Sequence, residues 1–337
     1  MLSLRRTDSR VVLDSKSPVP VPVVGEALVR ITRVALGSPD AVTTGEQSPF
    51  QGTLGQEGVG VVEHLWAGAT GEESRKWERK RVAISSVLSC GACEVCRGGM
   101  GWHCVMGTAM GRMGRDGVLA QFAAVPLRNL TEIPSGLDDD RAAFAGVVGS
   151  VVQMTHAVRV ERRTFVTVLG DGVTGLIAGQ LLAKSNASVR LLGRHESRFL
   201  LCERWGIKHR HERDAGRRGD QDVVVDCTGM PGGLEMACKL VRPRGVIVVK
   251  GPPSRGVRQS RMVCLDAAAS HEVTVIFSAA SNPREGLGVL EARGVDVLAL
   301  ITRRGKLSDG AALLDWAGSR EHLAVLVEPE AARGLAA

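Results

Sequence analysis

The sequence predicts an α/β protein in which a β-rich first half precedes a doubly wound parallel sheet, and three observations support this prediction. Over roughly the first 145 residues, short strand-like runs such as Ala27–Thr32, Gly58–Glu63 and Arg81–Ser85 lie between Gly, Pro and Ser residues. In the second half, continuous apolar runs alternate with helical patterns, which is typical of parallel strands covered on both faces. With 337 residues, the chain is also too long for one ordinary core and indicates two domains.

The apolar runs of the second half are the predicted strands of the parallel sheet. They are Phe165–Leu169, Ser188–Leu192, Asp222–Val225, Gly245–Val249 and Val273–Phe277. A last strand-like run, Leu323–Val327, is expected to rejoin the first domain. We therefore expect a first domain at residues 1–147, a second at residues 148–285, and a C-terminal return of residues 286–337 that packs on the first.

Composition and charge exclude several classes of protein. The net charge of +7 would suit a nucleic-acid binder, but the basic residues are dispersed, aromatic residues make up only 3%, and no known nucleic-acid-binding module is present. The basic start, with Arg5, Arg6 and Arg10, has no following apolar stretch, so we expect no signal peptide there. The longest apolar segment, residues 165–183, is interrupted by Asp171 and several glycines, unlike a membrane span. We expect a soluble cytoplasmic protein that binds neither nucleic acid nor membrane.

Four cysteines within fifteen residues form the pattern C-x2-C-x2-C-x7-C. They are Cys90, Cys93, Cys96 and Cys104. This spacing folds one loop around a tetrahedral metal, and four thiolates leave no open coordination position, so the predicted zinc is structural rather than catalytic. The alternative, two disulfides or four unrelated thiols, is unusual in an intracellular protein. We expect one structural zinc per chain, in a lobe at about residues 88–106.

A glycine pattern opens the second half, directly after the first predicted parallel strand and directly before a helix. The first glycine of G-x-G-x-x-G permits a tight turn, the second lets a pyrophosphate approach the backbone, and the third lets helix and strand pack closely. The helix N-terminus adds a favourable field for the negative charge. The predicted cofactor-binding loop comprises Gly170, Gly172, Val173, Thr174 and Gly175. The second domain is therefore predicted to bind a dinucleotide.

The end of the second parallel strand indicates which dinucleotide is bound. A domain that binds NAD usually carries Asp or Glu there for the ribose hydroxyl, but this chain has Gly193 followed by Arg194. Glycine leaves room for a 2′-phosphate, and Arg194, supported by Arg198, offers it a planar donor fork. We expect NADP(H) rather than NAD(H). The alternative is a surface arginine beside a permissive pocket, and the neighbouring Glu196 would oppose a phosphate.

Several landmarks now stand in a recognisable order. They are Pro49-Phe50, Leu54–Gly60, the cysteine lobe, Asp226–Gly229, Leu240–Gly245 and Val325–Pro329. Over nearly the whole chain this order resembles the zinc-type medium-chain dehydrogenase/reductase superfamily, the alcohol dehydrogenase-like proteins. The resemblance implies a GroES-like substrate domain, a Rossmann domain, an active-site cleft between them, and a homodimer or homotetramer acting on a small-molecule substrate. It also places Thr228 among the cofactor-binding residues.

The chain departs from this pattern at the positions that hold a catalytic zinc in the family. Gly37 replaces a cysteine, Gln56 replaces a histidine and Gly146 replaces a glutamate. Glycine supplies no ligand atom, and an amide oxygen is a poor ligand for borderline-soft zinc. The hydroxyl that usually relays a proton is also lost, because Pro39 stands there. We expect no catalytic zinc.

Two hypotheses of function remain. In the first, the protein is an NAD(P)-dependent oxidoreductase that acts on a carbonyl, an alcohol or an activated alkene without zinc. The developing oxyanion would then be stabilised by neutral donors, with Ser38 and Gln56 as candidates and with Asp40 and Glu57 orienting them. Structural alternatives exist for three of them: Ser38 turns the chain, Gln56 satisfies buried backbone, and Glu57 is a structural carboxylate. In the second hypothesis, the chain is a non-catalytic nucleotide-binding sensor or scaffold descended from a zinc dehydrogenase.

Overall fold

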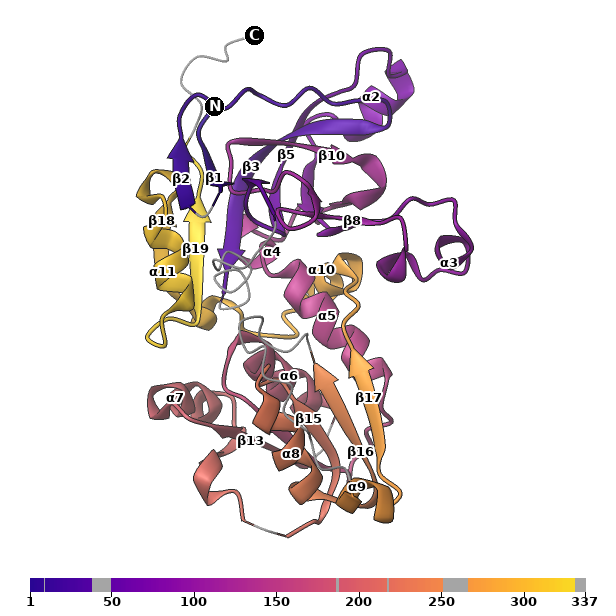
Figure 1. Ribbon diagram of the computed structural model, residues 1–337, viewed down its shortest axis with the longest axis vertical. Coiled ribbons are helices and arrows are strands. Elements are labelled where there is room, and N and C mark those ends of the chain that lie inside the picture. The colour runs from indigo at the N-terminus through magenta and orange to yellow at the C-terminus, as the bar shows by residue number, and fades with distance from the viewer. Residues whose placement is uncertain (9, 38–49, 186–187, 217, 251–265, 331–337) are drawn as a thin grey trace. The chain divides into compact units, whose positions relative to one another are not determined.

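The structure is a computed structural model that describes residues 1–8, 10–37, 50–185, 188–216, 218–250 and 266–330. Over these residues the chain forms two compact units (Figure 1). The first consists of Met1–Gly146, Pro283–Glu291 and the residues from Leu300 onward, and the second of Val147–Asn282 and Ala292–Ala299. The change of unit after Gly146 lies one residue before the boundary predicted from the sequence.

A seven-stranded sheet organises the first unit, in the order β11-β6-β5-β3-β19-β18, with β10 also paired to β3. Its strands are β3 (Glu26–Leu36), β5 (Gly58–Leu65), β6 (Arg81–Ile84), β10 (Phe122–Pro126), β11 (Leu130–Glu132), β18 (Ile301–Lys306) and β19 (Ala324–Glu328). At eleven residues, β3 is long enough to pair with β5 on one edge and with β10 and β19 in turn on the other. Its apolar side chains, Val29 and Ile31 among them, are buried in the core of this unit.

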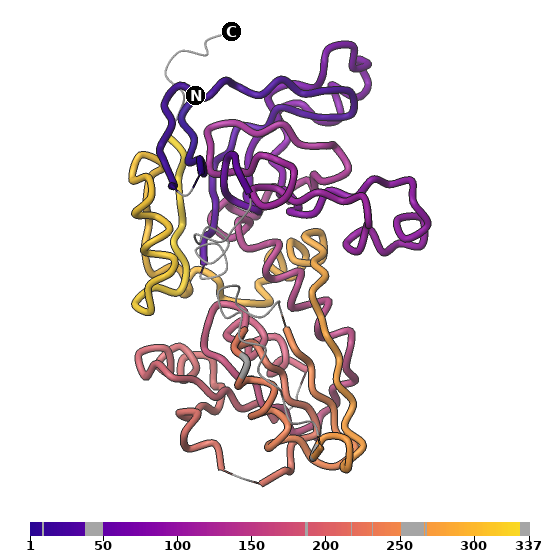
Figure 2. Tube along the Cα trace, in the orientation of Figure 1, coloured from indigo at the N-terminus to yellow at the C-terminus, as the bar shows by residue number. Residues whose placement is uncertain are grey.

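The C-terminal part of the chain is divided between the two units. Strand β19 pairs antiparallel with the end of β3, so that Val325 lies opposite Leu36, and Figure 2 shows the yellow C-terminal trace beside the indigo strands of the first unit. Residues 292–299 belong instead to the second unit, where the backbone N–H of Asp296 donates to Gln180 Oε1 at 2.7 Å. The return that the sequence predicts as one continuous segment is therefore split.

Two small sheets and several short helices complete the first unit. One sheet joins β1 (Ser3–Thr7), β2 (Arg10–Asp14) and β4 (Gly52–Thr53), and the other joins β7 (Val87–Leu88), β8 (Thr108–Met110) and β9 (Gly114–Arg115). The helical segments are α2 (Gly71–Trp77), α3 (Glu94–Arg97), α4 (Asp139–Ala142), α10 (Pro283–Glu291), α11 (Ala312–Gly318), η1 (Gly101–His103), η2 (Leu127–Asn129) and η5 (Leu307–Asp309). Because β7 pairs with β8, the two strands close the loop that carries the four-cysteine pattern.

The second unit is a doubly wound sheet of six parallel strands, in the order β14-β13-β12-β15-β16-β17. Its strands are β12 (Phe165–Leu169), β13 (Ser188–Gly193), β14 (Lys208–His211), β15 (Gln221–Asp226), β16 (Val241–Lys250) and β17 (Thr274–Ser278). Its helical segments are α5 (Ala145–His156), which begins in the first unit, α6 (Val173–Lys184), α7 (Glu196–Arg204), α8 (Pro231–Leu240), α9 (Asp266–Ser270), η3 (Glu212–Asp214) and η4 (Leu298–Leu300). Right-handed crossovers place α6 and α7 on one face and α8 on the other. This is the strand order of a Rossmann fold, so the predicted α/β class is confirmed.

The order of the strands reverses beside β12, since β13 follows on one side and β15 on the other. In open parallel sheets, ligands bind at the carboxyl ends of the strands next to such a switch point. The segment that leaves β12 at this end begins with Gly170, the first glycine of the predicted loop. In the described parts of the chain, no helix has the length and apolar character needed to cross a membrane.

Candidate functional site

The glycine loop has the geometry that its sequence predicts. Gly170 follows β12 with φ +100°, a conformation that side chains rarely adopt, and its N–H donates to the Leu192 carbonyl oxygen at 2.9 Å. A Cβ on Gly170 would lie 3.1 Å from the backbone of Cys227, at the end of the neighbouring strand. The first glycine therefore permits both the turn and the close approach of two strand ends.

The second and third glycines differ in the space around them. A Cβ on Gly172 would meet nothing within 4 Å, whereas a Cβ on Gly175 would overlap with the carbonyl oxygen of Gly170. Gly172 is also the N-cap of the twelve-residue helix α6 and provides no side-chain cap, so the first N–H groups of the helix have no capping side chain. With Val173 and Thr174 in that first turn, the loop fits an anionic pyrophosphate.

Asp171 is a buried charged residue of this loop, and its carboxylate accepts hydrogen bonds from the residues after β13. Its Oδ2 accepts the backbone N–H of Arg194 at 2.8 Å and that of His195 at 2.7 Å. Its Oδ1 lies 3.0 Å from His195 Nδ1 and 3.4 Å from an Arg198 guanidinium nitrogen. Burial alone would raise the pKa of Asp171, but these hydrogen bonds and the positive charge of Arg198 lower the pKa below its usual value. A buried carboxylate thus joins the glycine loop to the turn after β13.

The residues predicted to bind the 2′-phosphate lie near the Asp171 carboxylate, and each of them makes different contacts. A Cβ on Gly193 would lie 2.5 Å from Asp171 Oδ2, so the absence of a side chain at Gly193 makes room for the Asp171 carboxylate. Arg198 contacts Asp171 rather than supporting Arg194. The side chain of Arg194 is 55% exposed, and its Nε donates to Glu212 Oε1 at 2.6 Å. Arg194 is therefore the exposed arginine of the turn after β13.

Thr228, which the resemblance places at the cofactor, is held by the end of β15. Its backbone N–H and its hydroxyl both donate to Asp226 Oδ1, at 2.9 and 2.6 Å. Burial raises the pKa of Asp226, and the two bonds from Thr228 oppose that shift. The Thr228 hydroxyl oxygen also accepts the Met230 N–H at 3.1 Å, which fixes the turn at the switch point.

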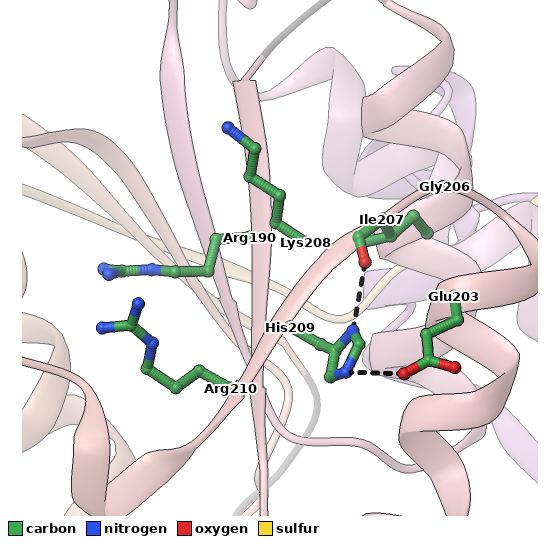
Figure 3. Close-up of a pocket in the computed structure, with 7 residues that line it drawn as sticks. All are labelled: Arg190, Glu203, Gly206, Ile207, Lys208, His209 and Arg210. Carbon is green, nitrogen blue, oxygen red and sulfur yellow. Dashed lines mark hydrogen bonds and ion pairs between the residues drawn. The ribbon is translucent and has the colours of Figure 1, made fainter.

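A cavity at the outer edge of the same sheet contains none of the predicted cofactor-binding residues. It has a volume of about 420 Å³ and lies beside edge strand β14 (Figure 3). Figure 3 shows Arg190, Lys208 and Arg210 on one side of the strand and the pair His209 and Glu203 on the other, with His209 Nε2 3.6 Å from the Glu203 carboxylate. This cavity is a charged hollow distinct from the glycine loop.

The four predicted zinc ligands converge in the first unit. The sulfur atom of Cys93 lies 3.4 Å from that of Cys96 and 3.9 Å from that of Cys104, and Cys90 lies 3.9 Å from Cys96. Zn–S bonds of about 2.3 Å in a tetrahedron give sulfur separations of about 3.8 Å, whereas a disulfide needs about 2.05 Å. All four sulfur atoms lie within 4.8 Å of one another. The donors fit a structural zinc and do not fit disulfides.

Backbone N–H groups favour the thiolate form of one of these cysteines, Cys90. Hydrogen bonds from the N–H groups of Ala92 and Cys93 lower the pKa of the Cys90 thiol to about 6. Zinc binds the thiolate form, so this lowered pKa favours the ligand state. The Cys96 thiol differs, because burial and the hydrogen bond with Cys93 raise its pKa to about 11, so a bound metal would have to displace its proton.

At one of the positions that hold a catalytic zinc in the family, the carboxylate of Glu57 occupies the space that a side chain at Gly146 would need. A Cβ on Gly146 would overlap with the carboxylate of Glu57 and lie 2.6 Å from its Oε1. The same Oε1 accepts the hydroxyl of the buried Ser86 at 3.0 Å. Glu57 precedes β5, Ser86 follows β6, and Gly146 lies in the first turn of α5, so three separate elements meet at this carboxylate.

Of the remaining catalytic candidates, the structure describes Gln56 but not Ser38. Gln56 is half-buried in the loop between β4 and β5, next to Glu57. Gly37 directly follows β3, and Ser38 and Asp40 lie outside the described residues. The structure therefore brings together Glu57 and Gly146 of the predicted set, and it adds Ser86.

Three residues of these sites were missed by the sequence analysis. Ser86 lies 29 residues from Glu57, and no pattern connects them. Glu212 follows a strand that the sequence did not reveal. Asp171 did carry a signal, because an acid inside a loop that binds phosphate needs partners for its charge.

Comparison with known proteins supports this description. Residues 24–135 match the alcohol dehydrogenase GroES-like domain family. An alcohol dehydrogenase of Cupriavidus necator is 24% identical over 358 residues, with 92% of this chain and 94% of that protein covered.

Two solved structures share the fold over almost the whole chain. A proposed zinc-binding dehydrogenase of Sinorhizobium meliloti 1021, bound to NADP, matches with a TM-score of 0.86 and 23% identity, covering 97% of this chain and 99% of that one. A short chain alcohol dehydrogenase of E. coli CFT073, complexed with NADH, matches with a TM-score of 0.85 and 21% identity, covering 97% and 99%. The GroES-like and Rossmann predictions are thereby confirmed. The chain contains an alcohol dehydrogenase GroES-like domain, is similar over almost its whole length to alcohol dehydrogenases, and is an alcohol dehydrogenase-like oxidoreductase.

Proposed function

We propose that the protein is an NADP(H)-preferring oxidoreductase that acts on a carbonyl or alcohol, or on an activated alkene, without a catalytic zinc. The observation that carries this proposal is the position of the Glu57 carboxylate over Gly146. We further propose a small-molecule substrate and assembly as a homodimer or homotetramer, as the superfamily resemblance implies.

The zinc-free part of the proposal rests on three positions taken together. No side chain can extend from Gly146 while Glu57 fills the adjacent space, so the third ligand position is blocked as well as empty. Gln56 offers an amide at the second position and Gly37 offers no ligand atom at the first. One carboxylate and one amide do not make the three-ligand site that zinc catalysis requires.

The chemistry then depends on neutral donors. Bound NADPH would supply the hydride, as nicotinamide cofactors do. The side-chain amide of Gln56 and the hydroxyl of Ser38 would donate to the oxygen on which negative charge develops, in the manner of an oxyanion hole. Glu57, held by Ser86, would orient the Gln56 amide next to it in the chain.

The preference for NADP(H) is supported by the charge of the turn after β13. Arg194 of this turn is exposed and pairs with Glu212, while Arg198 of helix α7 is directed to Asp171. An exposed ion pair contributes about 0–1 kcal/mol, so a doubly charged phosphate can displace Glu212 at little cost. Solved neighbours hold NADP in one case and NADH in another, so the preference of this chain depends on its own residues.

A cofactor titration combined with a substrate screen tests the proposal. Calorimetry should show tighter binding of NADPH than of NADH, and NADPH oxidation should respond to at least one aldehyde, ketone, quinone or enone. Tight NADPH binding with no turnover across the whole panel would favour the non-catalytic sensor or scaffold. Equal binding of both cofactors would contradict the NADP(H) preference.

A further inference from the structure

The buried carboxylate of Asp171 contacts both halves of the predicted cofactor site. Its backbone belongs to the glycine loop, between Gly170 and Gly172, and its side chain reaches the turn after β13. Asp171 is 5% exposed, so its charge cannot be solvated and depends on the donors that surround it. Those donors all belong to the segment that begins at Arg194.

These donors fix the backbone of the turn as well as its side chains. Both backbone N–H groups, of Arg194 and His195, point inward to the same oxygen, Asp171 Oδ2. His195 Nδ1 lies 3.0 Å from Oδ1 and 3.1 Å from Oδ2, and the Arg198 guanidinium approaches Oδ1. A carboxylate that accepts two N–H groups from successive residues determines the orientation of the peptide units between them.

The packing at Gly193 shows that the arrangement depends on close contact. A Cβ at this position would lie 2.5 Å from Asp171 Oδ2 and 2.6 Å from Asp171 Cβ. Any larger residue would push the carboxylate away from the N–H groups of the turn. Gly193 and Asp171 are therefore complementary, and the glycine is explained without reference to a ligand.

Asp171 distinguishes Arg194, in the turn after β13, from Arg198, in helix α7. Arg198 is 12% exposed at its side chain and is neutralised by Asp171, whereas Arg194 lies outside on the exposed side. The negative charge of Asp171 is thus directed inward and balanced, where it does not repel an anion outside the turn. An NAD-binding acid at the end of this strand would face the ribose instead.

We propose that Asp171 is a positioning residue that holds the turn after β13 in the shape that binds the 2′-phosphate of NADPH, and so sets the cofactor preference. The inference rests on the proposed function, because it presupposes that NADP(H) binds at the glycine loop. It assigns to Asp171 no contact with the cofactor. Its effect is transmitted through the backbone of Arg194 and His195.

The test compares two substitutions at this position. Asp171→Ala removes the acceptor, so we expect NADPH to bind about tenfold more weakly, while NADH binding changes by less than about threefold. Asp171→Asn keeps an oxygen for the two backbone N–H groups and should restore most of the NADPH affinity. A merely electrostatic role would give the opposite result for Asn, because removal of a negative charge would strengthen phosphate binding.

A matched control separates positioning from general destabilisation. Asp222 is another carboxylate of the second unit, and it accepts the Phe165 N–H at 2.7 Å and Arg242 Nε at 2.7 Å at the opposite end of the strands. Asp222→Ala should lower the melting temperature without changing the ratio of NADPH to NADH affinity. If Asp171→Ala does not fold, Gly193→Ala displaces the same carboxylate and should show the same selective loss of NADPH affinity.

The outcomes also separate this inference from the proposed function. A wild-type protein without NADPH preference would contradict the proposed function. A wild-type protein with that preference, combined with equal losses of NADPH and NADH affinity in Asp171→Ala, would overturn the inference alone. Stronger NADPH binding by Asp171→Asn would overturn it as well.

Discussion

At Gly146 the missing side chain has a structural reason, because the carboxylate of Glu57 fills the space next to its Cα. The sequence predicts the absence of a ligand at Gly146 and the survival of an acid at Glu57. It does not predict that the two are complementary, since the positions are far apart in the chain and no periodic pattern joins them. Ser86 escaped prediction for the same reason, because a single serine after a strand carries no signal of its partner.

Substitution of Gly146 tests this complementarity. Alanine there would collide with Glu57, so Gly146→Ala should lower the free energy of unfolding by about 1–3 kcal/mol, measured by urea denaturation. In the double variant with Glu57→Ala, most of this loss should disappear.

A second glycine of the same unit provides the control. A Cβ on Gly288, in helix α10, would meet nothing within 4 Å. Gly288→Ala should therefore stabilise the protein by about 0.5–1 kcal/mol, as alanine does in a helix interior. An unchanged or increased stability of Gly146→Ala would contradict the overlap with Glu57.

Among the elements, β14 shows what an apolar pattern cannot detect. Five of the six parallel strands are continuous apolar runs and were predicted, but Lys208–His211 contains no apolar residue. Because β14 is an edge strand, its charged side chains are compatible with strand geometry and discourage pairing with other chains. Missing β14 also meant missing Glu212, the partner of Arg194, which lies just beyond this strand.

Removal of either partner of the Arg194–Glu212 ion pair should change the affinity for NADPH, and the two changes should have opposite directions. Arg194→Ala removes the exposed donor fork and should weaken NADPH binding by about tenfold or more, with little effect on NADH. Glu212→Ala removes the competitor of the phosphate and should strengthen NADPH binding by about twofold to fivefold. Calorimetric titration of both variants measures these changes. Equal losses of NADPH and NADH affinity in Arg194→Ala would show that Arg194 does not contact the 2′-phosphate.

The cysteine lobe is a separate element whose stability depends on its metal. Removal of zinc with a chelator leaves four thiols of the segment between β7 and β8 without their common partner, so the lobe should unfold. Circular dichroism melting should show a lower transition temperature after chelation, and added zinc should restore it. Because the glycine loop belongs to the other unit, NADPH binding should persist in the chelated protein. Parallel loss of NADPH binding would show that the lobe supports more than its own unit.

For the whole molecule, composition and motif order were sufficient to predict two domains and their fold class. The parallel sheet was predictable because strands buried on both faces leave long apolar runs in the sequence. The division of the C-terminal segment was not, because residues 292–299 join the second unit through specific contacts such as that of Asp296 with Gln180. Such contacts depend on positions distant in the chain, which local patterns do not encode.

For the whole molecule we propose that the dehydrogenase fold keeps a structural zinc at the four cysteines and holds no catalytic zinc. Metal analysis of the purified protein measures this claim directly, with the Cys96→Ser variant analysed beside the wild type. We predict about one zinc per chain for the wild type and almost none for Cys96→Ser, since all of the zinc belongs to the four-cysteine lobe. Two zinc ions per chain, or one retained in the Cys96→Ser variant, would contradict the account.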